Sequence, residues 1–95
     1  MSDPSRTAAR VRQQRASLVA DLTSGALDVR ALGNETRAPL VKVVVLAEAV
    51  PGVGKVRSRR ILAALDVAPE ARWGELDPDL AGRVIDALVS AAGGA

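Results

Sequence analysis

The chain has 95 residues, of which 48% are hydrophobic and 25% are charged, and this suits one domain with a single compact core. It contains no Cys and no His, which excludes disulfides, the common zinc and iron–sulfur sites, thiol nucleophiles and histidine acid–base catalysis. The formal net charge is only +2, no apolar run approaches the ~20 residues that span a bilayer, and no signal-peptide pattern begins the chain.

A long helix is expected at the N-terminus, over residues 5–23. Val11, Leu18 and Leu22 follow a helical spacing along one face, and Gly25 supplies a helix end of the usual type. The same helix carries four arginines, namely Arg6, Arg10, Arg12 and Arg15. Because the apolar stripe is thin, we expect this helix to be mobile in the absence of a partner.

The middle of the chain is expected to be helical as well. One short helical turn over residues 28–32 and a polar connector over 34–38 lead to a helix over 39–50. Its β-branched run would favour a strand locally. A buried helix is nevertheless favoured by Pro39 at a first helical position and by apolar residues at 40, 43, 47 and 50. Residues 55–65 form the next expected helix.

The last part of the chain is expected to complete an all-α fold. Trp73 marks a short buried segment, and Asp77 caps a final helix over 78–90. The carboxylates around these positions are interpreted as caps and helix-dipole partners instead of metal ligands: Glu70, Glu75, Asp77 and Asp79. We expect residues 91–95 to be a disordered tail.

The most informative chemistry lies at residues 51–60. Gly52 and Gly54 permit a tight turn at a helix N-terminus, where unpaired N–H groups and the helix dipole favour an anion such as phosphate. Four cations surround this turn, with Lys55 and Arg59 on one side of the helix and Arg57 and Arg60 on the far side. A nucleotide-binding P-loop is disfavoured, because it needs four residues between its glycines and this turn has one.

Charge is divided unevenly along the chain. Residues 1–60 contain eleven basic and five acidic side chains, whereas residues 61–95 contain two basic and six acidic ones. This division predicts a basic part that faces a polyanion and an acidic part that faces away. The alternative is that the arginines are merely well solvated.

The string from Val50 to Ser58 resembles the helix–hairpin–helix motif, which grips DNA phosphates. From about Val41 to Leu88 the chain resembles the helix–two-turn–helix module of the actinobacterial (mycobacterial-type) integration host factors, which are small nucleoid-associated proteins. The segments that carry this resemblance are Val41-Lys42-Val43, Leu46 to Lys55, Arg57 to Leu65, Val67-Ala68-Pro69, Arg72 and, in the N-terminal helix, Ala9 to Leu18. The resemblance implies that residues 1–35 form an Arg-rich helix and its connector. It also implies that residues 36–90 form a helix–two-turn–helix domain.

The resemblance also implies a function and a set of binding residues. We expect a cytoplasmic, nucleoid-associated monomer that binds the phosphate backbone of double-stranded DNA with little sequence specificity, and that bends or bridges DNA. We expect no catalytic residue, no metal site, no cofactor, no small-molecule substrate and no membrane partner. The expected DNA-binding residues are Gly52, Val53, Gly54, Lys55, Val56, Arg57, Arg59, Arg60, Arg72, Arg10, Arg12 and Lys42. Only Arg72 is basic where the family clusters cations after its Ala-Pro turn, so a second DNA surface there is left open.

Two other functions remain open from the sequence. Residues 52–65 also resemble the head domain of a small-subunit ribosomal protein that grips rRNA, although that family continues into a long basic tail. A helical protein-interaction module is the other alternative. Single-stranded nucleic acid is disfavoured, since Trp73 is the sole aromatic residue and single-strand binders stack bases on several rings.

Overall fold

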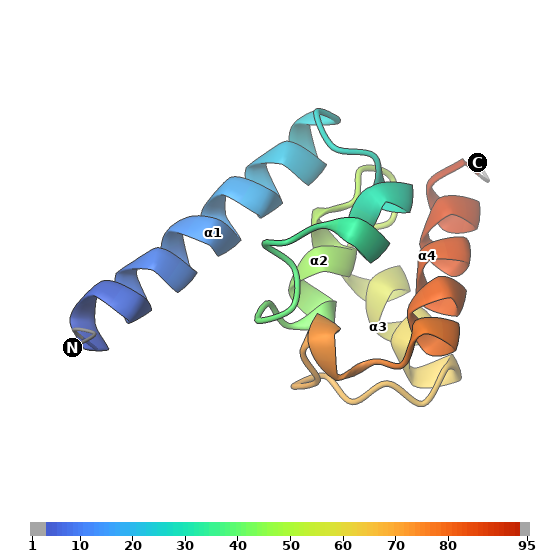
Figure 1. Ribbon diagram of the computed structural model, residues 1–95. Helices are drawn as coiled ribbons and strands as arrows, with labels where there is room; N and C mark the ends of the chain where they lie inside the picture. Colours follow the sequence, from blue (N-terminus) through green and yellow to red (C-terminus); the bar gives the residue numbers. More distant parts are fainter. Residues whose placement is uncertain (1–3, 94–95) are drawn as a thin grey trace.

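A computed structural model describes residues 4–93, and every regular element in that range is helical (Figure 1). In chain order these elements are α1 (Pro4–Ser24), the 3-10 helix η1 (Val29–Asn34), α2 (Val43–Ala49), α3 (Lys55–Ala64), the 3-10 helix η2 (Trp73–Glu75) and α4 (Pro78–Gly93). The all-α prediction is therefore confirmed for the described part of the chain. No helix within residues 4–93 is both long and apolar enough to cross a membrane.

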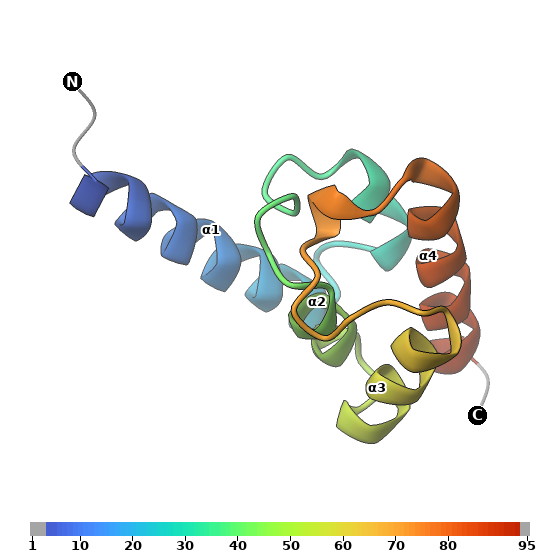
Figure 2. The same ribbon diagram turned by 90° about the horizontal axis from the view of Figure 1, so that it is seen from below.

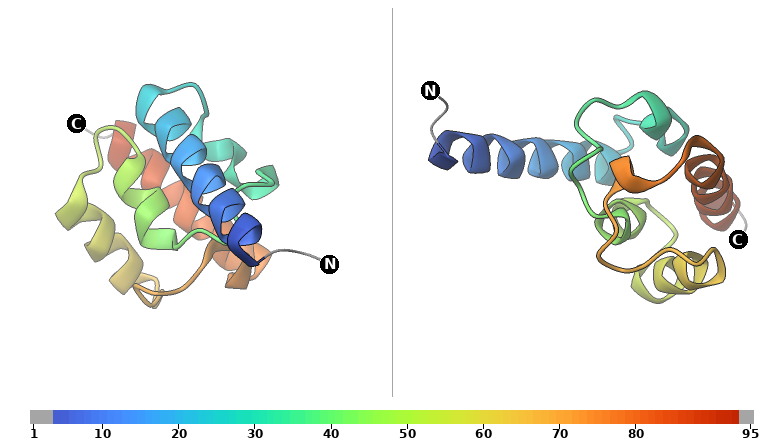
Figure 3. Two further views of the ribbon diagram at one scale, coloured as in Figure 1. Left: turned by 90° about the vertical axis from the view of Figure 1, so that its left-hand side faces the viewer. Right: turned by 60° about the horizontal axis from the view of Figure 1, so that its bottom comes forward.

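Helix α1 is partly core and partly a projecting arm. Its second half buries Leu18 and Leu22 against α2, whereas its first half extends away from the compact part (Figures 1 and 3). The molecule is correspondingly elongated, with extents of 48 × 27 × 22 Å. The expected helix over residues 5–23 is thus present, and its thin apolar stripe is used only near its C-terminal end.

Helix α2 lies at the centre of the core. It packs on α1 and on α3, α3 packs on α4, and α4 packs on η1, so α4 covers the side away from α1 (Figure 2). Val43, Leu46 and Ala47 of α2 are fully buried, as are Val84 and Leu88 of α4. Because burial of such side chains is the main stabilising term, this core fixes where the loops between the helices emerge.

The helix expected over residues 39–50 begins at Val43, so the prediction was wrong for its first turn. Residues 38–41 form a turn instead, in which the Val41 amide donates to the Ala38 carbonyl at 2.9 Å. The carbonyls of Pro39 and Val41 then accept hydrogen bonds from the amides of Gly74 and Trp73, each at 2.9 Å. These carbonyls are therefore engaged by a distant segment and are not available to a helix.

Segment 71–74 runs antiparallel to segment 39–43 in this region. The Val43 amide donates to the Ala71 carbonyl at 2.9 Å, and Lys42 and Arg72 form an isolated antiparallel bridge. A Cβ added to Gly74 would lie 3.0 Å from Pro39, a tight contact, so this close approach favours glycine. The apolar spacing of residues 39–43 suits a helix, but hydrogen bonds to residues 71–74 hold this segment in a turn instead. Such long-range hydrogen bonds cannot be predicted from the spacing of apolar residues.

The remaining boundaries follow the sequence more closely. Trp73 is buried, and Asp77 caps α4 through a 2.8 Å hydrogen bond from the Leu80 amide to its carboxylate, as expected. Helix α4 continues to Gly93, so residues 91–93 are helical and not part of a disordered tail. Residues 94–95, the rest of the expected tail, lie outside the described residues. Because η1 packs on α4, residues 29–34 contribute to the same core as α4.

Candidate nucleic-acid interface

The hairpin between α2 and α3 depends on two glycines. Gly52 has φ of +87° and Gly54 has φ of +80°, a region that L side chains rarely adopt. A Cβ on Gly52 would also lie 3.3 Å from the Ala92 carbonyl oxygen at the end of α4. Val53, between the glycines, is only 5% exposed and anchors the turn in the core. The hairpin is therefore a rigid structure with its glycine backbone at the surface.

The start of α3 presents bare backbone amides. Gly54 is the N-cap residue and has no side chain with which to cap the helix. The first intrahelical bond is donated by the Ser58 amide to the Gly54 carbonyl at 3.1 Å, and the buried Ser58 hydroxyl donates to the same oxygen at 2.7 Å. The amides of residues 55–57 precede that bond in an exposed part of the chain, and the N–H groups of such a helix N-terminus can donate to an anion.

Three cations of α3 lie beside these amides. An open hollow of about 450 Å³ is lined by the hairpin and the first turns of α3, namely by Val53, Gly54, Lys55, Val56, Arg57 and Arg60. The Arg57 guanidinium also donates to the Ala91 carbonyl at 3.1 Å, near the C-terminus of α4. We call Lys55, Arg57 and Arg60 with the amides of residues 55–57 the hairpin cluster.

Arg59 lies apart from the hairpin cluster. Its Nε is 3.4 Å from Oε1 of Glu48 on α2, and this oxygen is buried without a hydrogen bond from the described residues. Arg59 lines a different hollow, together with Val44 and Leu62. Lys55 and Arg59 lie four positions apart in α3 and so share one side of the helix, as expected. The Arg59 side chain nevertheless turns toward Glu48 on α2 and does not line the hollow that Lys55 lines.

A second group of cations is assembled from three segments. Arg12 and Arg15 of α1, Lys42 before α2 and Arg72 before η2 line a cavity of about 120 Å³. Between them lies Leu40, whose side chain is 53% exposed. We call these four cations the α1–turn cluster. Arg10 is exposed on α1 but does not line this cavity.

Backbone pairing explains why Arg72 belongs to this cluster. The bridge between Lys42 and Arg72 brings the two residues together across 30 positions of sequence. The Arg72 guanidinium donates to the Leu40 carbonyl at 2.8 Å, and the Arg72 amide donates to the Glu75 carboxylate at 3.1 Å. Arg72, the isolated cation in an acidic stretch of sequence, therefore joins the basic part of the molecule.

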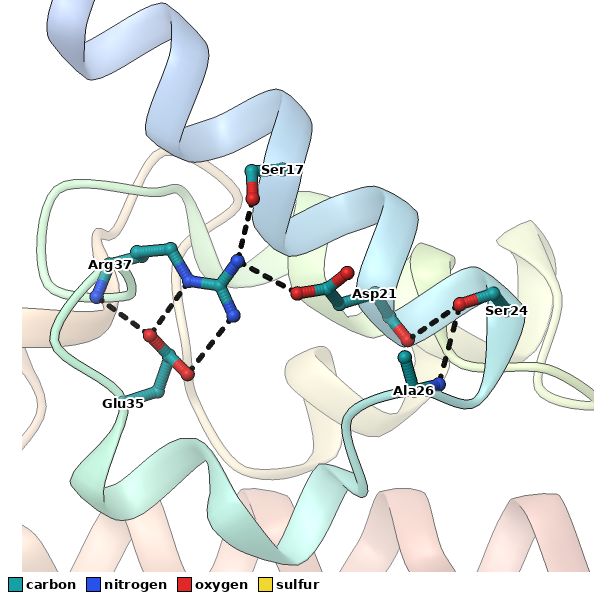
Figure 4. Close-up of polar contacts among 6 residues, drawn as sticks. All are labelled: Ser17, Asp21, Ser24, Ala26, Glu35 and Arg37. Atoms are coloured by element: carbon teal, nitrogen blue, oxygen red, sulfur yellow. Dashed lines mark hydrogen bonds and ion pairs between the residues drawn. The ribbon is translucent and has the colours of Figure 1, made fainter.

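An ion-pair network ties α1 to the compact part (Figure 4). Arg37, in the loop before α2, donates from Nε to the Glu35 carboxylate at 2.8 Å. Its Nη1 donates to the Asp21 carboxylate at 2.8 Å and to the Ser17 hydroxyl at 2.7 Å, both on α1. We call this the Arg37 network. It sets the direction of α1 and with it the position of Arg12 and Arg15 in the α1–turn cluster.

Protonation states in the Arg37 network reflect these contacts. The hydrogen bonds from the Arg37 side chain and amide lower the pKa of Glu35 below its ordinary value of 4.5. Hydrogen bonding to Glu35 first, and to Asp21 second, raises the pKa of Arg37 above its already high value. Both groups are therefore charged at neutral pH, and the network is a true ion-pair cluster.

Sequence reasoning missed two parts of this arrangement. Arg15 of α1 was not among the expected binding residues, yet it lines the cavity of the α1–turn cluster. Residues 34–38 were read as a polar connector, although Glu35 and Arg37 organise the network. The spacing Glu35-x-Arg37 was a local signal for that pair, but nothing local pointed to Asp21, 16 positions away. Within residues 4–93, no group of acidic side chains is arranged to hold a metal ion.

Comparisons with known proteins agree with this geometry. No protein-family model and no curated protein matches the chain. A solved structure of sIHF bound to an 8 bp palindromic DNA is similar to it, with a TM-score of 0.67 and 26% sequence identity. The match covers 93% of this chain and 99% of that chain. The chain therefore has the fold of this integration-host-factor-type, DNA-bound protein over nearly its whole length.

Proposed function

We propose that this protein is a nucleoid-associated protein that binds double-stranded DNA through its phosphate backbone, with little sequence specificity. The observation that carries the proposal is the hairpin cluster, in which uncapped amides of α3 lie beside Lys55, Arg57 and Arg60. Backbone amides and flexible cations bind phosphate oxygens but read no base edges, so they position a duplex without selecting its sequence. The fold shared with DNA-bound sIHF supports the same conclusion.

The α1–turn cluster is proposed as a further contact to phosphates. Its four cations come from segments that meet only in the folded chain, and three of them, Arg12, Lys42 and Arg72, were expected to bind DNA. Two separate basic clusters on one monomer would allow the protein to bend one duplex around itself or to bridge two. We place this activity in the cytoplasm, at the nucleoid.

Duplex DNA is favoured over single strands by the position of the sole aromatic side chain. Trp73 is 6% exposed and packs in the core, so it offers no face on which a base could stack. Single-strand binders rely on such stacking as well as on charge. The proposed partner is therefore a duplex that is bound from outside, along its backbone.

The proposal is tested by measuring binding to duplex DNA, single-stranded DNA and structured ribosomal RNA over a series of salt concentrations. We expect duplexes of unrelated sequence to bind equally. If about 4–6 phosphates are neutralised, the slope of log K against log salt should be about −4 to −5. Failure to bind duplex DNA at low salt, or a slope near zero, would contradict the proposal, and a strong preference for ribosomal RNA would favour the ribosomal alternative.

A further inference from the structure

Exposed apolar side chains coincide with the two basic clusters. In residues 4–93, the large hydrophobic side chains that remain exposed are Leu40, at 53%, and Val56, at 67%. Val56 lines the hollow of the hairpin cluster, and Leu40 lines the cavity of the α1–turn cluster. A single exposed apolar residue is unremarkable in a soluble protein. Here, however, both Leu40 and Val56 lie among cations. A partner of either site must therefore offer negative charge and an apolar contact at the same time.

Leu40 is presented by a firmly held backbone. It occupies the turn over residues 38–41, in which Pro39 takes the position that its fixed φ favours. Three consecutive carbonyls of this turn are bound by the segment opposite: Pro39 by the Gly74 amide, Leu40 by the Arg72 side chain and Val41 by the Trp73 amide. The Leu40 side chain therefore projects from a rigid support, and inserting it into a partner would require little ordering of the backbone.

The surroundings of Leu40 identify the chemistry of its partner. Four cations line the same cavity, namely Arg12, Arg15, Lys42 and Arg72. An apolar protein surface would leave these charges without partners and partly desolvated, which is unfavourable. A duplex offers phosphates to the cations. In its minor groove it also offers sugars and, at an opened base step, base faces to the leucine. Proteins that distort DNA commonly combine cations with a wedge of Leu, Phe, Ile, Met or Pro.

We infer that Leu40 is a wedge that enters the minor groove and partly unstacks one base step of the bound duplex, thereby kinking it. This inference rests on the proposed DNA-binding function and assigns the bend to a particular side chain. Leu40 is better suited to this role than Val56, because its side chain is longer and its turn is not itself a phosphate-binding element. Pro39, the adjacent exposed residue, belongs to the same class of wedge side chains.

The test measures duplex distortion by the full-length protein. A short duplex carries fluorophores at both ends, so that energy transfer reports bending, and 2-aminopurine at a central TA step, which unstacks easily. We expect the parent protein to bend the duplex by about 20–90° and to raise 2-aminopurine fluorescence. Leu40→Ala should lose most of both signals while weakening affinity by no more than about threefold, because phosphate contacts supply most of the binding.

Two further variants separate a wedge from the other roles that Leu40 could have. Leu40→Lys adds a cation to the cluster, so it should bind at least as tightly as the parent but without unstacking. Val56→Ala truncates the other exposed apolar side chain, which lines the hairpin cluster, so this variant is compared with the parent at protein concentrations that saturate the duplex. Under those conditions it should keep the fluorescence increase per bound duplex, whatever its affinity.

Unchanged distortion by Leu40→Ala, or an equal loss of distortion with Val56→Ala, would overturn the inference. So would duplex binding by the parent protein without any unstacking, and in that case the proposed function would still stand. Absence of duplex binding by the parent protein would instead contradict the proposed function itself.

Discussion

Arg37 is the residue that most directly links the N-terminal helix to the core. Its side chain is 23% exposed and bonds to Glu35, 14% exposed, as well as to Asp21 on α1. Removing one member of such a partly buried network leaves its partners without a hydrogen bond or counter-charge to offset the cost of their desolvation. At the scale of a single side chain, this network therefore helps to fix the direction of α1, together with the burial of Leu18 and Leu22.

Arg37→Gln is expected to lower the free energy of unfolding, and by more than the surface control below, because two carboxylates and a hydroxyl lose their donor. Urea denaturation followed by circular dichroism measures this change. The matched control is Arg30→Gln, since Arg30 pairs with Asp28 at the surface, with side chains 68% and 59% exposed. The control should change stability by less than about 1 kcal/mol. Equal effects of the two variants would contradict the importance of the Arg37 network.

Glu35 makes the stability of this network depend on pH. Its pKa is lowered in the folded protein, so its contribution is fully present above the ordinary value of 4.5 and is lost as the pH falls through the lower, folded value. Glu35→Gln cannot titrate and should flatten this part of the acid-denaturation curve. Urea midpoints of parent and variant between pH 7 and pH 3 measure the difference. Parallel curves for the two proteins would be inconsistent with a lowered pKa at Glu35.

At the scale of whole elements, α3 is the helix whose role was easiest to predict. The glycines of the hairpin require positive φ, and the run of cations after them follows directly in sequence, so both were visible without a structure. The orientation of individual arginines could not be predicted, because it depends on contacts with other helices. Arg59 faces Glu48, and Arg57 reaches the end of α4.

Arg59 and Arg60 therefore form a matched pair of neighbours for testing the hairpin cluster. Arg60→Gln should weaken binding to all duplexes and make the salt slope shallower by about 0.9, the value expected for one lost phosphate contact. Arg59→Gln should leave the slope nearly unchanged, since this side chain is paired with Glu48. Binding assays at four or more salt concentrations distinguish the two. An equal loss with both variants would indicate that α3 acts through its total charge.

Helix α2 shows where sequence reasoning reached its limit. The apolar spacing correctly placed Val43, Ala47 and Val50 in the core, but it extended the helix back to Pro39. The turn at residues 38–41 is instead stabilised by hydrogen bonds to residues 72–74, more than 30 positions away. The same long-range pairing creates the α1–turn cluster, so the error in the helix boundary and the missed position of Leu40 have one physical cause.

The division of charge has a different meaning in the folded molecule than in the sequence. Several acidic side chains of the second half act as caps: Glu75 accepts from the Arg72 amide, and Asp77 accepts from the Leu80 amide. Meanwhile Arg72, one of the two cations in this part of the chain, is paired with Lys42 across the backbone bridge. Folding therefore brings Arg72, from the acidic part of the sequence, next to a cation of the basic part.

At the scale of the whole molecule, the contributions of the two basic clusters to DNA binding can be measured separately by neutralising one of them. The double variant Arg12→Gln with Arg15→Gln removes two cations from the α1–turn cluster and leaves the hairpin cluster intact. It should still bind duplex DNA, but with a salt slope shallower by about 1.8 and with less compaction of a long duplex. Binding assays over salt and imaging of plasmid compaction measure these effects.

A charge-matched control is Arg6→Gln with Arg83→Gln, because both arginines are exposed and neither lines the two clusters. If this control loses as much affinity and compaction as the Arg12 and Arg15 variant, diffuse positive charge would account for binding. A selective loss with the Arg12 and Arg15 variant would mean that the direction of α1, set by the Arg37 network, is part of how the whole molecule holds a duplex.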